Sequence, residues 1–396
     1  MEQDISSTVR YAGVDDTAAP LFENQYNLPK GMSYNSYVIL DDEIAVMDSV
    51  EHGKATQWME QVEEATGGRA PRYLVAHHVE PDHSASVAEA MDRWSGLTVV
   101  GSAKALAMLQ QFFPGRDFSG RTLAVMEGST LSLGSHTLTF YSAPMVHWPE
   151  VMVSYESSER LLFSADAFGK FGALCHESGD WAPEARRYYC NIVGKYGPQV
   201  RALLDKASKL EIDRILPLHG PVLGPDFGRE LDLYRHWSSY EPEESGVLVA
   251  YSTIYGGTRD AALRLAALLR EKGASVTDVE LRPGDLSEAV AQAFRYSTIV
   301  VAAPTYDAGI FPPMYDFLHH LQIKGWRGRT AAVVENGSWA PTSGRLMADM
   351  LSQCRDIAFV EPRVCIRSRL DSASLAQLSD LAGALMKHLA QEVKKN

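Results

Sequence analysis

The stretch His-Val-Glu-Pro-Asp-His at residues 78–83 places four metal-capable side chains, His78, Glu80, Asp82 and His83, within six positions. Residues 72–76 (RYLVA) before it predict a buried strand, and residues 84–94 after it predict a helix. The motif therefore falls in a turn at the carboxyl end of a strand, where binding residues collect. In an extended loop, His-x-Glu-x-Asp directs alternate side chains to one side, and the next residue adds a second imidazole. This carboxylate-rich set favours redox-active iron over structural zinc, which prefers Cys and His.

The same motif is also compatible with a solvated loop in which Asp82 caps the following helix. Three further metal-capable residues argue against that interpretation, because each follows an apolar, strand-like run. They are His147 after residues 138–141, Asp166 after residues 161–165 and His219 after residues 215–218. Several strand ends that each carry such a residue predict one metal site built from distant parts of the chain.

These seven residues give the first half of the chain a clear resemblance to the flavodiiron proteins. Their catalytic domain has a metallo-β-lactamase fold with a His-x-Glu-x-Asp-His motif, a distant His, an Asp and a final His. Residues 32–37 (MSYNSY), 166–169 (DAFG) and 188–192 (YYCNI) match as well. The resemblance implies one iron held by His78, Glu80 and His147, a second held by Asp82, His83 and His219, and Asp166 as the bridge. The other histidines lack this context, with His77 the best candidate for a supporting role.

The second half begins with a strand, a turn and a helix. An apolar run at residues 247–251 (VLVAY) leads into a turn of hydroxyls and glycines, and an amphipathic run follows at residues 259–272. Backbone N–H groups and hydroxyls before a helix form a cradle for a phosphate, although an ordinary βα loop has a similar composition. No P-loop lysine and no Gly-x-Gly-x-x-Gly is present, which disfavours nucleoside triphosphates and dinucleotides. The turn consists of Ser252, Thr253, Ile254, Tyr255, Gly256, Gly257 and Thr258.

Two later loops follow further buried strands. In an open parallel sheet, the loops at the carboxyl ends of adjacent strands meet at the switch point, where ligands bind. Tyr306 and Trp339 offer flat faces for an aromatic ring, although each alone is equally consistent with simple packing. Together with the turn at residues 252–258, these loops resemble those that hold FMN in flavodoxin. Their residues are Pro304, Thr305, Tyr306, Asp307, Asn336, Gly337, Ser338 and Trp339.

The chain departs from the flavodiiron pattern at two of these positions. Gly257 stands where relatives commonly carry Ser or Asn, which implies the loss of one side-chain contact to the FMN phosphate. Asp307 stands where Asn is frequent, and its charge near the ring would disfavour the anionic reduced flavin and lower its potential. Neither change touches the expected iron ligands.

The expected fold class is α/β with two domains. Residues 1–240 are expected to form a metallo-β-lactamase-like αββα sandwich, with a hairpin over residues 37–50 that turns at Asp41 and Asp42. Residues 246–396 are expected to form a flavodoxin-like, doubly wound, parallel five-stranded sheet. The polar segment at residues 237–245 marks the expected boundary, and its shortness predicts that the two domains hold a fairly fixed relation.

Composition excludes several classes. The net charge of −13 argues against nucleic acid, and thus against the nuclease branch of the β-lactamase fold. No run of 18 or more apolar residues suggests a membrane span, and the acidic amino end is unlike a signal peptide, so we expect a cytoplasmic protein. The four cysteines, Cys175, Cys190, Cys354 and Cys365, form no Cys-x-x-Cys pair, which predicts reduced thiols and no rubredoxin module.

The resemblance implies an oxidoreductase with FMN and two iron ions. Electrons would pass from an external donor, such as a rubredoxin or a reduced deazaflavin, through FMN to a diiron site that reduces dioxygen to water, nitric oxide to nitrous oxide, or both. A head-to-tail homodimer or a dimer of dimers would bring the cofactors of two chains together. Two alternatives stay open: a zinc-dependent hydrolase with a regulatory flavodoxin domain, opposed by Glu80, and a flavin electron carrier with an inactive metal domain, opposed by the complete ligand set.

Overall fold

The computed structural model describes residues 5–177 and 179–392. The chain divides into two compact units, and each is described separately below. The first unit consists of Met1–Tyr189 and Pro198–Arg235, and the second of Cys190–Gly197 and His236–Asn396. The short segment Cys190–Gly197 thus groups with the second unit, although it lies within the first half of the sequence. A domain boundary at residues 240–246 is kept as a proposal.

The first unit contains two main sheets. In the first sheet the strand order is β1-β6-β7-β8-β9-β10, and β6 and β7 form the predicted antiparallel hairpin around Asp41 and Asp42. From β7 to β10 the strands are parallel. The bounds are β1 Val9–Tyr11, β6 Tyr37–Ile39, β7 Ala45–Met47, β8 Tyr73–Val75, β9 Thr98–Ser102 and β10 Thr122–Val125.

The second sheet of this unit has the order β11-β12-β13-β14-β15, antiparallel except for the last pair. Its strands are β11 Thr130–Ser132, β12 Thr137–Ser142, β13 Met152–Glu156, β14 Leu161–Phe163 and β15 Arg214–Leu216. One buried cluster joins the sheets, since it contains Ile39 and Val100 from the first and Phe140 and Phe163 from the second. The two sheets therefore pack face to face around a shared apolar core.

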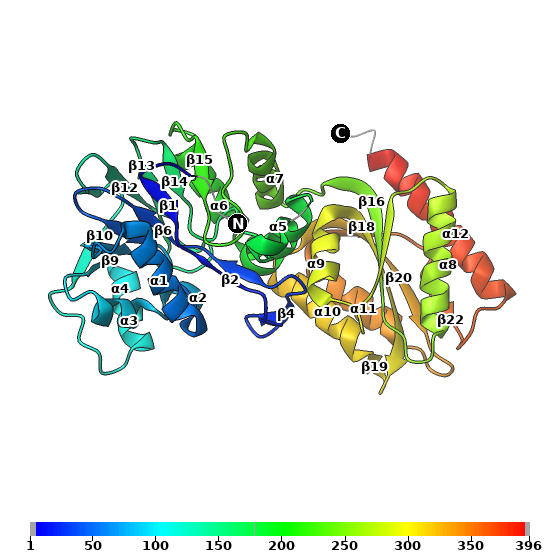
Figure 1. The fold of residues 1–396 in the computed structure, drawn as a ribbon. Coiled ribbons are helices and arrows are strands. Elements are labelled where there is room, and N and C mark those ends of the chain that lie inside the picture. Colours follow the sequence, from blue (N-terminus) through cyan, green and yellow to red (C-terminus); the bar gives the residue numbers. More distant parts are fainter. Residues whose placement is uncertain (1–4, 178, 393–396) are drawn as a thin grey trace. The chain divides into compact units, whose positions relative to one another are not determined.

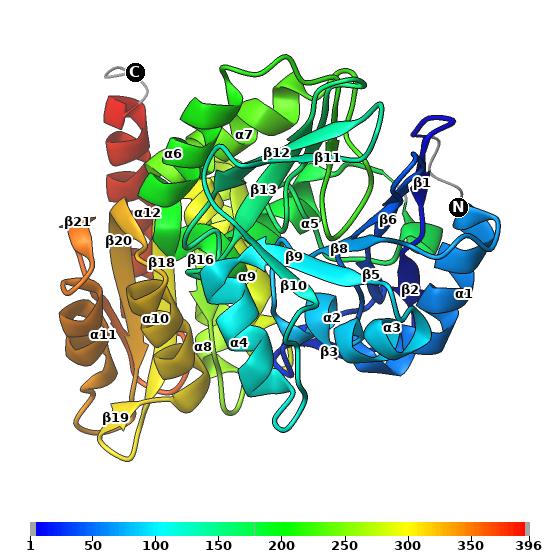
Figure 2. The same cartoon turned by 90° about the vertical axis from the view of Figure 1, so that its left-hand side faces the viewer.

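Helices cover the outer faces of both sheets (Figure 1, Figure 2). Helices α1 Ala55–Thr66, α3 Val87–Arg93 and α4 Ala103–Phe112 accompany the first sheet, and α6 Gly197–Ala207 and α7 Gly228–Ser239 accompany the second. Leu204 of α6 and Leu231 of α7 lie close to Leu162 and Ile215 of the second sheet. The unit is thus the predicted αββα sandwich of metallo-β-lactamase type.

Short elements complete the first unit. They are β2 Val14–Asp16, β3 Leu21–Phe22, β4 Tyr26–Asn27, β5 Met32–Tyr34, α2 Pro81–Ser84 and α5 Ala182–Tyr188, with 3₁₀ turns at His52–Lys54 and Leu174–His176. A π-helical stretch Tyr189–Val193, whose first residue still belongs to the first unit, leads into the 3₁₀ turn Gly194–Tyr196.

The second unit is built on one sheet with the order β17-β16-β18-β20-β21, all parallel. Counted along the chain this is the order 2-1-3-4-5 of flavodoxin-like folds, as predicted. The strands are β16 Glu244–Tyr251, β17 Val276–Glu280, β18 Tyr296–Tyr306, β20 Arg327–Asn336 and β21 Arg355–Phe359. The continuous apolar stretches of the three central strands, β16, β18 and β20, reflect burial on both faces.

The edge next to β20 is interrupted. Strand β21 pairs with the first part of β20, whereas a separate strand, β22 Val364–Ile366, pairs with its end at Val334–Asn336. A two-residue strand, β19 Gly309–Ile310, folds back on the end of β18. The chain after β22 is thereby placed beside the carboxyl end of β20.

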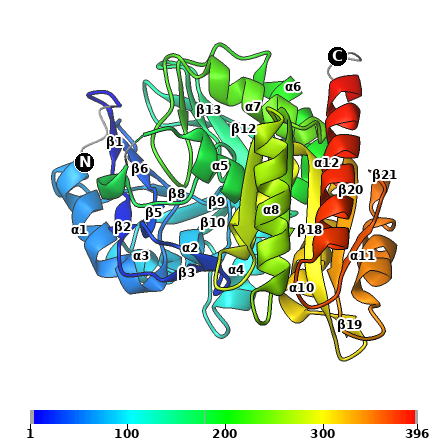
Figure 3. The same ribbon diagram turned by 90° about the vertical axis from the view of Figure 1, so that its right-hand side faces the viewer.

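Helices lie on both faces of this sheet (Figure 3). Helices α8 Gly257–Glu271 and α12 Ser372–Glu392 cover one face, and α9 Leu286–Arg295, α10 Pro312–Ile323 and α11 Ser343–Leu351 cover the other. In α8, the buried residues recur at helical spacing, and Leu265 and Leu269 pack with Leu381 of α12 against Val249 and Val300. Among residues 5–177 and 179–392, no helix is long and apolar enough to span a bilayer.

Candidate metal centre and cofactor pocket

The motif at residues 78–83 directly follows strand β8. Glu80 precedes the short helix α2, in which Pro81 occupies the first turn, a position that suits its fixed φ. The expectation of an extended loop through Asp82 is therefore wrong, because Pro81 starts a helical turn inside the motif. Asp82 lies within that turn and does not cap it. His78 and Glu80 approach from the strand side, while Asp82 and His83 project from the turn.

One group of potential ligands contains His78, Glu80, His147 and Asp166, whose donor atoms all lie within 4.8 Å of one another. Glu80 Oε2 lies 3.2 Å from His78 Nε2 and 3.0 Å from His147 Nε2. Asp166 Oδ2 lies 3.1 Å from His147 Nε2. Three separate segments of the first unit thus supply nitrogen and oxygen atoms around one point.

A second group contains Asp82, His83 and His219, again within 4.8 Å of one another. Asp82 Oδ2 lies 3.3 Å from the Nε2 atoms of both His83 and His219. Asp166 lies between the two groups: its Oδ1 is 3.2 Å from His83 Nε2, while its Oδ2 faces the first group. The structure therefore brings all seven sequence-predicted residues together, with Asp166 facing both sets.

The arrangement fits bound cations. His219 Nδ1 lies 2.7 Å from the Ser33 carbonyl oxygen and must donate to it, which leaves His219 Nε2 without a proton in the neutral ring. That atom lies only 3.1 Å from His83 Nε2. Both carboxylate oxygens of Asp82 and Oδ1 of Asp166 are buried and accept no hydrogen bond from a described residue. Because unsatisfied buried acceptors are costly, a cation in each group would resolve this.

Neighbouring imidazoles and carboxylates in the cluster stabilise each other's charged forms. Burial alone would lower the pKa of His147, but the Asp166 and Glu80 carboxylates outweigh burial and raise it to about 9. Burial likewise favours the neutral form of Glu80, yet His147 and His78 hold the pKa of that carboxyl well below its usual range. The pocket therefore stabilises anionic carboxylates next to positive charge, as a cation site requires.

Of the residues behind the ligands, His77 was expected from the sequence, whereas Glu150 and Asp48 were not. Glu150 Oε1 lies 2.7 Å from His78 Nδ1, and Asp48 Oδ1 accepts a hydrogen bond from the backbone N–H of His77. The His77 ring lies between Asp48 Oδ2, at 2.6 Å, and Ser154 Oγ, at 2.8 Å, so it braces the strand end. Both Glu150 and Asp48 had a signal in the sequence: Glu150 is an acidic residue three positions after His147, and Asp48 directly follows the apolar run at residues 44–47.

The second unit carries a cavity of about 480 Å³ at the carboxyl ends of β16, β18 and β20. Its volume is in the range of small-molecule sites, and the amino end of α8 lies at its edge. Among the sequence-predicted residues, those that line it are Thr253, Ile254, Tyr255, Gly257, Thr258, Pro304, Thr305, Asp307, Asn336, Gly337, Ser338 and Trp339.

Three sequence-predicted residues do not line this cavity. Gly256 precedes α8 with a φ of +87°, a conformation that suits glycine. Ser252 is fully buried, and its Oγ has no hydrogen-bond partner among the described residues. Tyr306 packs its ring against Phe311, with centroids 5.6 Å apart, beside the lining residues Thr305 and Asp307.

The sequence did not indicate the loop after β22 as part of the cavity, yet Ser368 and Arg369 line it. Asn336 ties this loop to the others: its Nδ2 donates to Thr258 Oγ1 at 3.3 Å and to the Ser368 carbonyl at 3.2 Å, and its Oδ1 accepts from Ser368 N. Tyr255 and Trp339 remain 87% and 80% exposed, which leaves aromatic faces free to stack on a ring. Hydroxyls, backbone N–H groups and aromatic faces together fit FMN.

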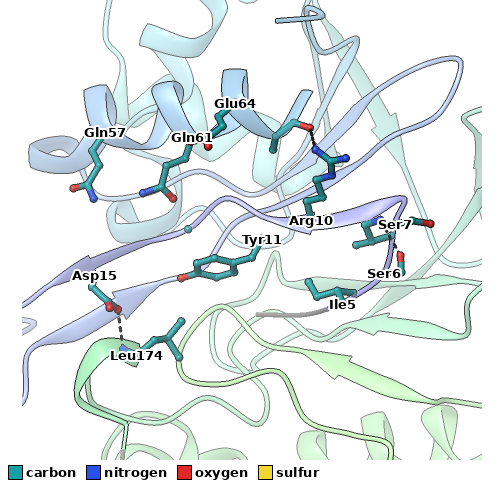
Figure 4. A pocket seen from close by; sticks show the side chains of 13 residues that line it. Ile5, Ser6, Ser7, Arg10, Tyr11, Asp15, Gln57, Gln61, Glu64 and Leu174 are labelled. Carbon is teal, nitrogen blue, oxygen red and sulfur yellow. Dashed lines mark hydrogen bonds between the residues drawn. The ribbon is translucent and has the colours of Figure 1, made fainter. Parts of the chain in front are cut away.

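A larger cavity of about 870 Å³ lies in the first unit, beside β1 and α1 (Figure 4). None of the seven clustered residues lines it. Three of its polar side chains are already engaged: Arg10 donates to the Ala65 carbonyl, Tyr11 donates to Asn35, and Asp15 accepts from the backbone N–H of Leu174. We assign no chemistry to it, because size alone does not make a site.

Comparisons with known proteins agree with this architecture. Residues 32–220 match the ODP family of beta-lactamase domains. The chain is 28% identical to the nitric oxide reductase of Moorella thermoacetica, covering 78% of this chain and 82% of that protein. It is 29% identical to the coenzyme F₄₂₀H₂ oxidase of Methanothermobacter marburgensis, covering 86% and 87%. It is 26% identical to the rubredoxin-oxygen oxidoreductase of Megalodesulfovibrio gigas, covering 82% of each.

A solved structure shares the fold over the whole length. The flavodiiron protein from Giardia intestinalis superposes with a TM-score of 0.89 at 24% identity, covering 99% of this chain and 98% of that one. This likeness spans both the αββα sandwich and the flavodoxin-like sheet. The β-lactamase family match over residues 32–220, the oxidoreductase relatives and the shared fold agree: this chain is similar to the flavodiiron proteins in sequence and in fold.

Proposed function

We propose that this protein is a flavodiiron oxidoreductase, which takes electrons from an external donor through FMN and uses them to reduce dioxygen to water, nitric oxide to nitrous oxide, or both. The observation that carries the proposal is the position of Asp166, whose two oxygens face two separate sets of nitrogen and oxygen ligands. Such a shared carboxylate is what a pair of metal ions requires.

In this proposal His78, Glu80 and His147 hold one iron, and Asp82, His83 and His219 hold the other, with Asp166 shared. Bound iron supplies redox chemistry and open positions for a small gas, and bound FMN supplies electrons singly or in pairs. The protein's own part is to hold the ligands ionised and correctly oriented. The His219–Ser33 and His78–Glu150 contacts perform that task for two of the imidazoles.

Flavin binding is proposed for the cavity of the second unit. The phosphate would lie at the amino end of α8 with Thr253 and Thr258, and the ring would lie near Trp339 and Asp307. Asn336 would act indirectly, since its hydrogen bonds hold the loops that form the cavity walls. The remaining proposed contacts are Ser252, Ile254, Tyr255, Gly256, Gly257, Pro304, Thr305, Tyr306, Gly337 and Ser338.

The proposed partners follow from chemistry and from relatives. The names of two relatives contain rubredoxin and coenzyme F₄₂₀H₂, and we propose for this chain an external electron donor such as a rubredoxin or a reduced deazaflavin. We further propose a head-to-tail homodimer or a dimer of dimers, and a cytoplasmic location. The free thiols of Cys175, Cys354 and Cys365 support a reducing compartment. The net charge of −13 supports partners other than nucleic acid.

The zinc-dependent hydrolase is not favoured, since the relatives are oxidoreductases and the cluster contains three carboxylates. An electron carrier without metal chemistry is disfavoured by the complete ligand set. Metal analysis of protein produced without added zinc separates these alternatives, because the proposal requires about two iron ions per chain.

The decisive experiment measures gas consumption by anaerobically reduced, FMN-loaded protein with dioxygen and nitric oxide tested side by side. We expect rapid uptake of at least one gas, abolished in His147→Ala and retained in His52→Ala, whose side chain is 74% exposed. Absence of uptake of either gas, with the flavin reduced and a donor present, would contradict the proposed function.

A further inference from the structure

The two ligand groups of the metal cluster differ in what contacts the Nδ1 atoms of their histidines, on the side of each ring opposite to the metal position. In the first group, His78 Nδ1 lies 2.7 Å from a carboxylate oxygen, Glu150 Oε1. In the second group, His219 Nδ1 lies at the same distance from a neutral carbonyl oxygen, that of Ser33. The Nδ1 atom of His83 is buried and has no hydrogen-bond partner among the described residues. The inference drawn from this difference rests on the proposed function, because it assumes that each group binds a metal ion.

Glu150 is held rigidly in place. Only 2% of its surface is exposed, and its Oε1 also accepts from the backbone N–H of Val79 at 3.2 Å. Its carbonyl oxygen accepts from Ser102 Oγ at 3.0 Å. Its other carboxylate oxygen, Oε2, is buried and has no hydrogen-bond partner in the described part of the chain, which is a costly arrangement for a residue with only a packing role. The side chain is therefore directed at the back of His78 by fixed contacts.

A carboxylate behind a ligating imidazole has two effects. It fixes the proton on Nδ1, so that Nε2 presents its lone pair to the metal, and it raises the basicity of the ring. A carbonyl oxygen orients the ring but donates less charge. We propose that Glu150 is a positioning residue that makes the His78–Glu80–His147 position bind its metal more tightly than the Asp82–His83–His219 position.

The asymmetry can be measured without turnover. Metal-free protein is titrated anaerobically with Co(II), and the visible absorption of each bound ion is followed against a competing chelator. For the wild type we expect two ions with distinct affinities. In Glu150→Gln, which keeps the size and the acceptor oxygen but removes the charge, we expect the tighter step to weaken by about 10-fold or more and the weaker step to change little.

Glu156→Gln is a matched control. Glu156 is also a buried glutamate of the first unit, but its carboxylate accepts from the backbone N–H groups of Ser158 and Glu159 at the β13–β14 turn. We expect this variant to lose stability while both Co(II) affinities stay unchanged. An equal effect of the two variants, or an unchanged tighter step in Glu150→Gln, would overturn the inference.

A second comparison tests the asymmetry without altering Glu150. His219→Ala weakens the second position and should retain the tighter of the two ions, whereas His147→Ala weakens the first and should retain the weaker. The opposite ranking would overturn the inference while leaving the diiron proposal intact. Failure of the wild type to bind two ions would overturn the diiron proposal itself, and the inference with it.

Discussion

Gly257 and Ser368 meet so closely that a Cβ atom at position 257 would lie 2.1 Å from the Ser368 carbonyl oxygen. The same carbonyl accepts a hydrogen bond from Asn336 Nδ2 at 3.2 Å, and that Nδ2 would lie 3.2 Å from the added atom. The first turn of α8 and the loop after β22 are thus interlocked. The glycine that departs from the family pattern is required here by packing.

Gly257→Ser is therefore expected to weaken FMN binding, even though it introduces the hydroxyl that relatives carry. The Ser368 loop must move, and forced overpacking of this kind costs about 1–3 kcal/mol. Binding is measured by quenching of FMN fluorescence, and stability by thermal unfolding. Gly383→Ala is the control, since nothing lies within 4 Å of a Cβ there and alanine in a helix should stabilise the protein by about 0.5–1 kcal/mol. Equal or tighter FMN binding by Gly257→Ser would show that the loop yields freely.

Asp307→Asn is expected to raise the reduction potential of bound FMN. Asp307 lines the cavity with a φ of +47°, a region that Asn tolerates as well as Asp, so the substitution removes charge without distorting the backbone. An interaction on the order of 1 kcal/mol corresponds to roughly 20 mV for a two-electron couple. The measurement is an anaerobic redox titration followed by flavin absorbance. A potential that stays equal or falls would refute an electrostatic role for Asp307.

The local pattern of apolar and polar residues was sufficient to predict most of the strands and helices of the fold. The apolar run at residues 72–76 became β8, and the buried runs of the second half became β16, β18 and β20, because parallel strands buried on both faces need continuous apolar sequence. The helix predicted at residues 84–94 formed instead as α2 and α3, since Pro81 starts a turn early. The metal cluster was predictable because each ligand follows a strand that ends at the same edge.

Features that depend on contacts between distant segments could not be predicted. Ser368 and Arg369 reach the flavin cavity only because the edge strand is split into β21 and β22. Pro362 lies at that break and could have indicated it, but it does not predict that the chain then returns to the end of β20. Glu150 acquires its role from a contact with His78, 72 positions away. Asp48, likewise, is 29 positions from His77. Such pairs are fixed by tertiary packing and have no local periodicity.

Away from the cluster, Asp41 and His136 are expected to make stability depend on pH. Asp41 Oδ2 lies 2.8 Å from His136 Nδ1, and Glu159 Oε1 lies 3.4 Å from His136 Nε2. Burial opposes ionisation of Asp41. The backbone N–H groups of His136, Ser135 and Asp42 and the ring of His136 donate to its carboxylate, and together they lower the pKa of Asp41 to about 2. Burial likewise opposes protonation of His136, but Asp41 and Glu159 outweigh it and raise its pKa.

The directions of these two pKa shifts determine the pH range over which the Asp41–His136 pair stabilises the protein. Asp41 contributes stability above its unfolded pKa of about 4, and this is lost as pH falls toward 2. His136 contributes stability below its unfolded pKa of about 6.5, and this is lost as pH rises through its raised folded value. The Tm difference between wild type and Asp41→Asn should therefore be largest between about pH 4 and 6.5. Loss of about 1 kcal/mol there lowers Tm by about 2–4 °C. Asp42→Asn serves as control, and a difference that is constant with pH would contradict the assignment.

Asp166→Asn is expected to reduce the bound iron more than any single substitution confined to one group. Asp166 is 1% exposed, with Oδ2 at 3.1 Å from His147 Nε2 and Oδ1 at 3.2 Å from His83 Nε2, so the change removes a charge that both positions share. Asp82→Asn is the comparison, because Asp82 groups with His83 and His219 and the change should affect mainly the second position. Iron and flavin per chain are measured together by elemental analysis and absorbance. The flavin content should stay the same in both variants, since its cavity is built from the second unit alone. If Asp166→Asn keeps about two iron ions per chain, the carboxylate is not shared between two metals, and the two ligand groups act independently.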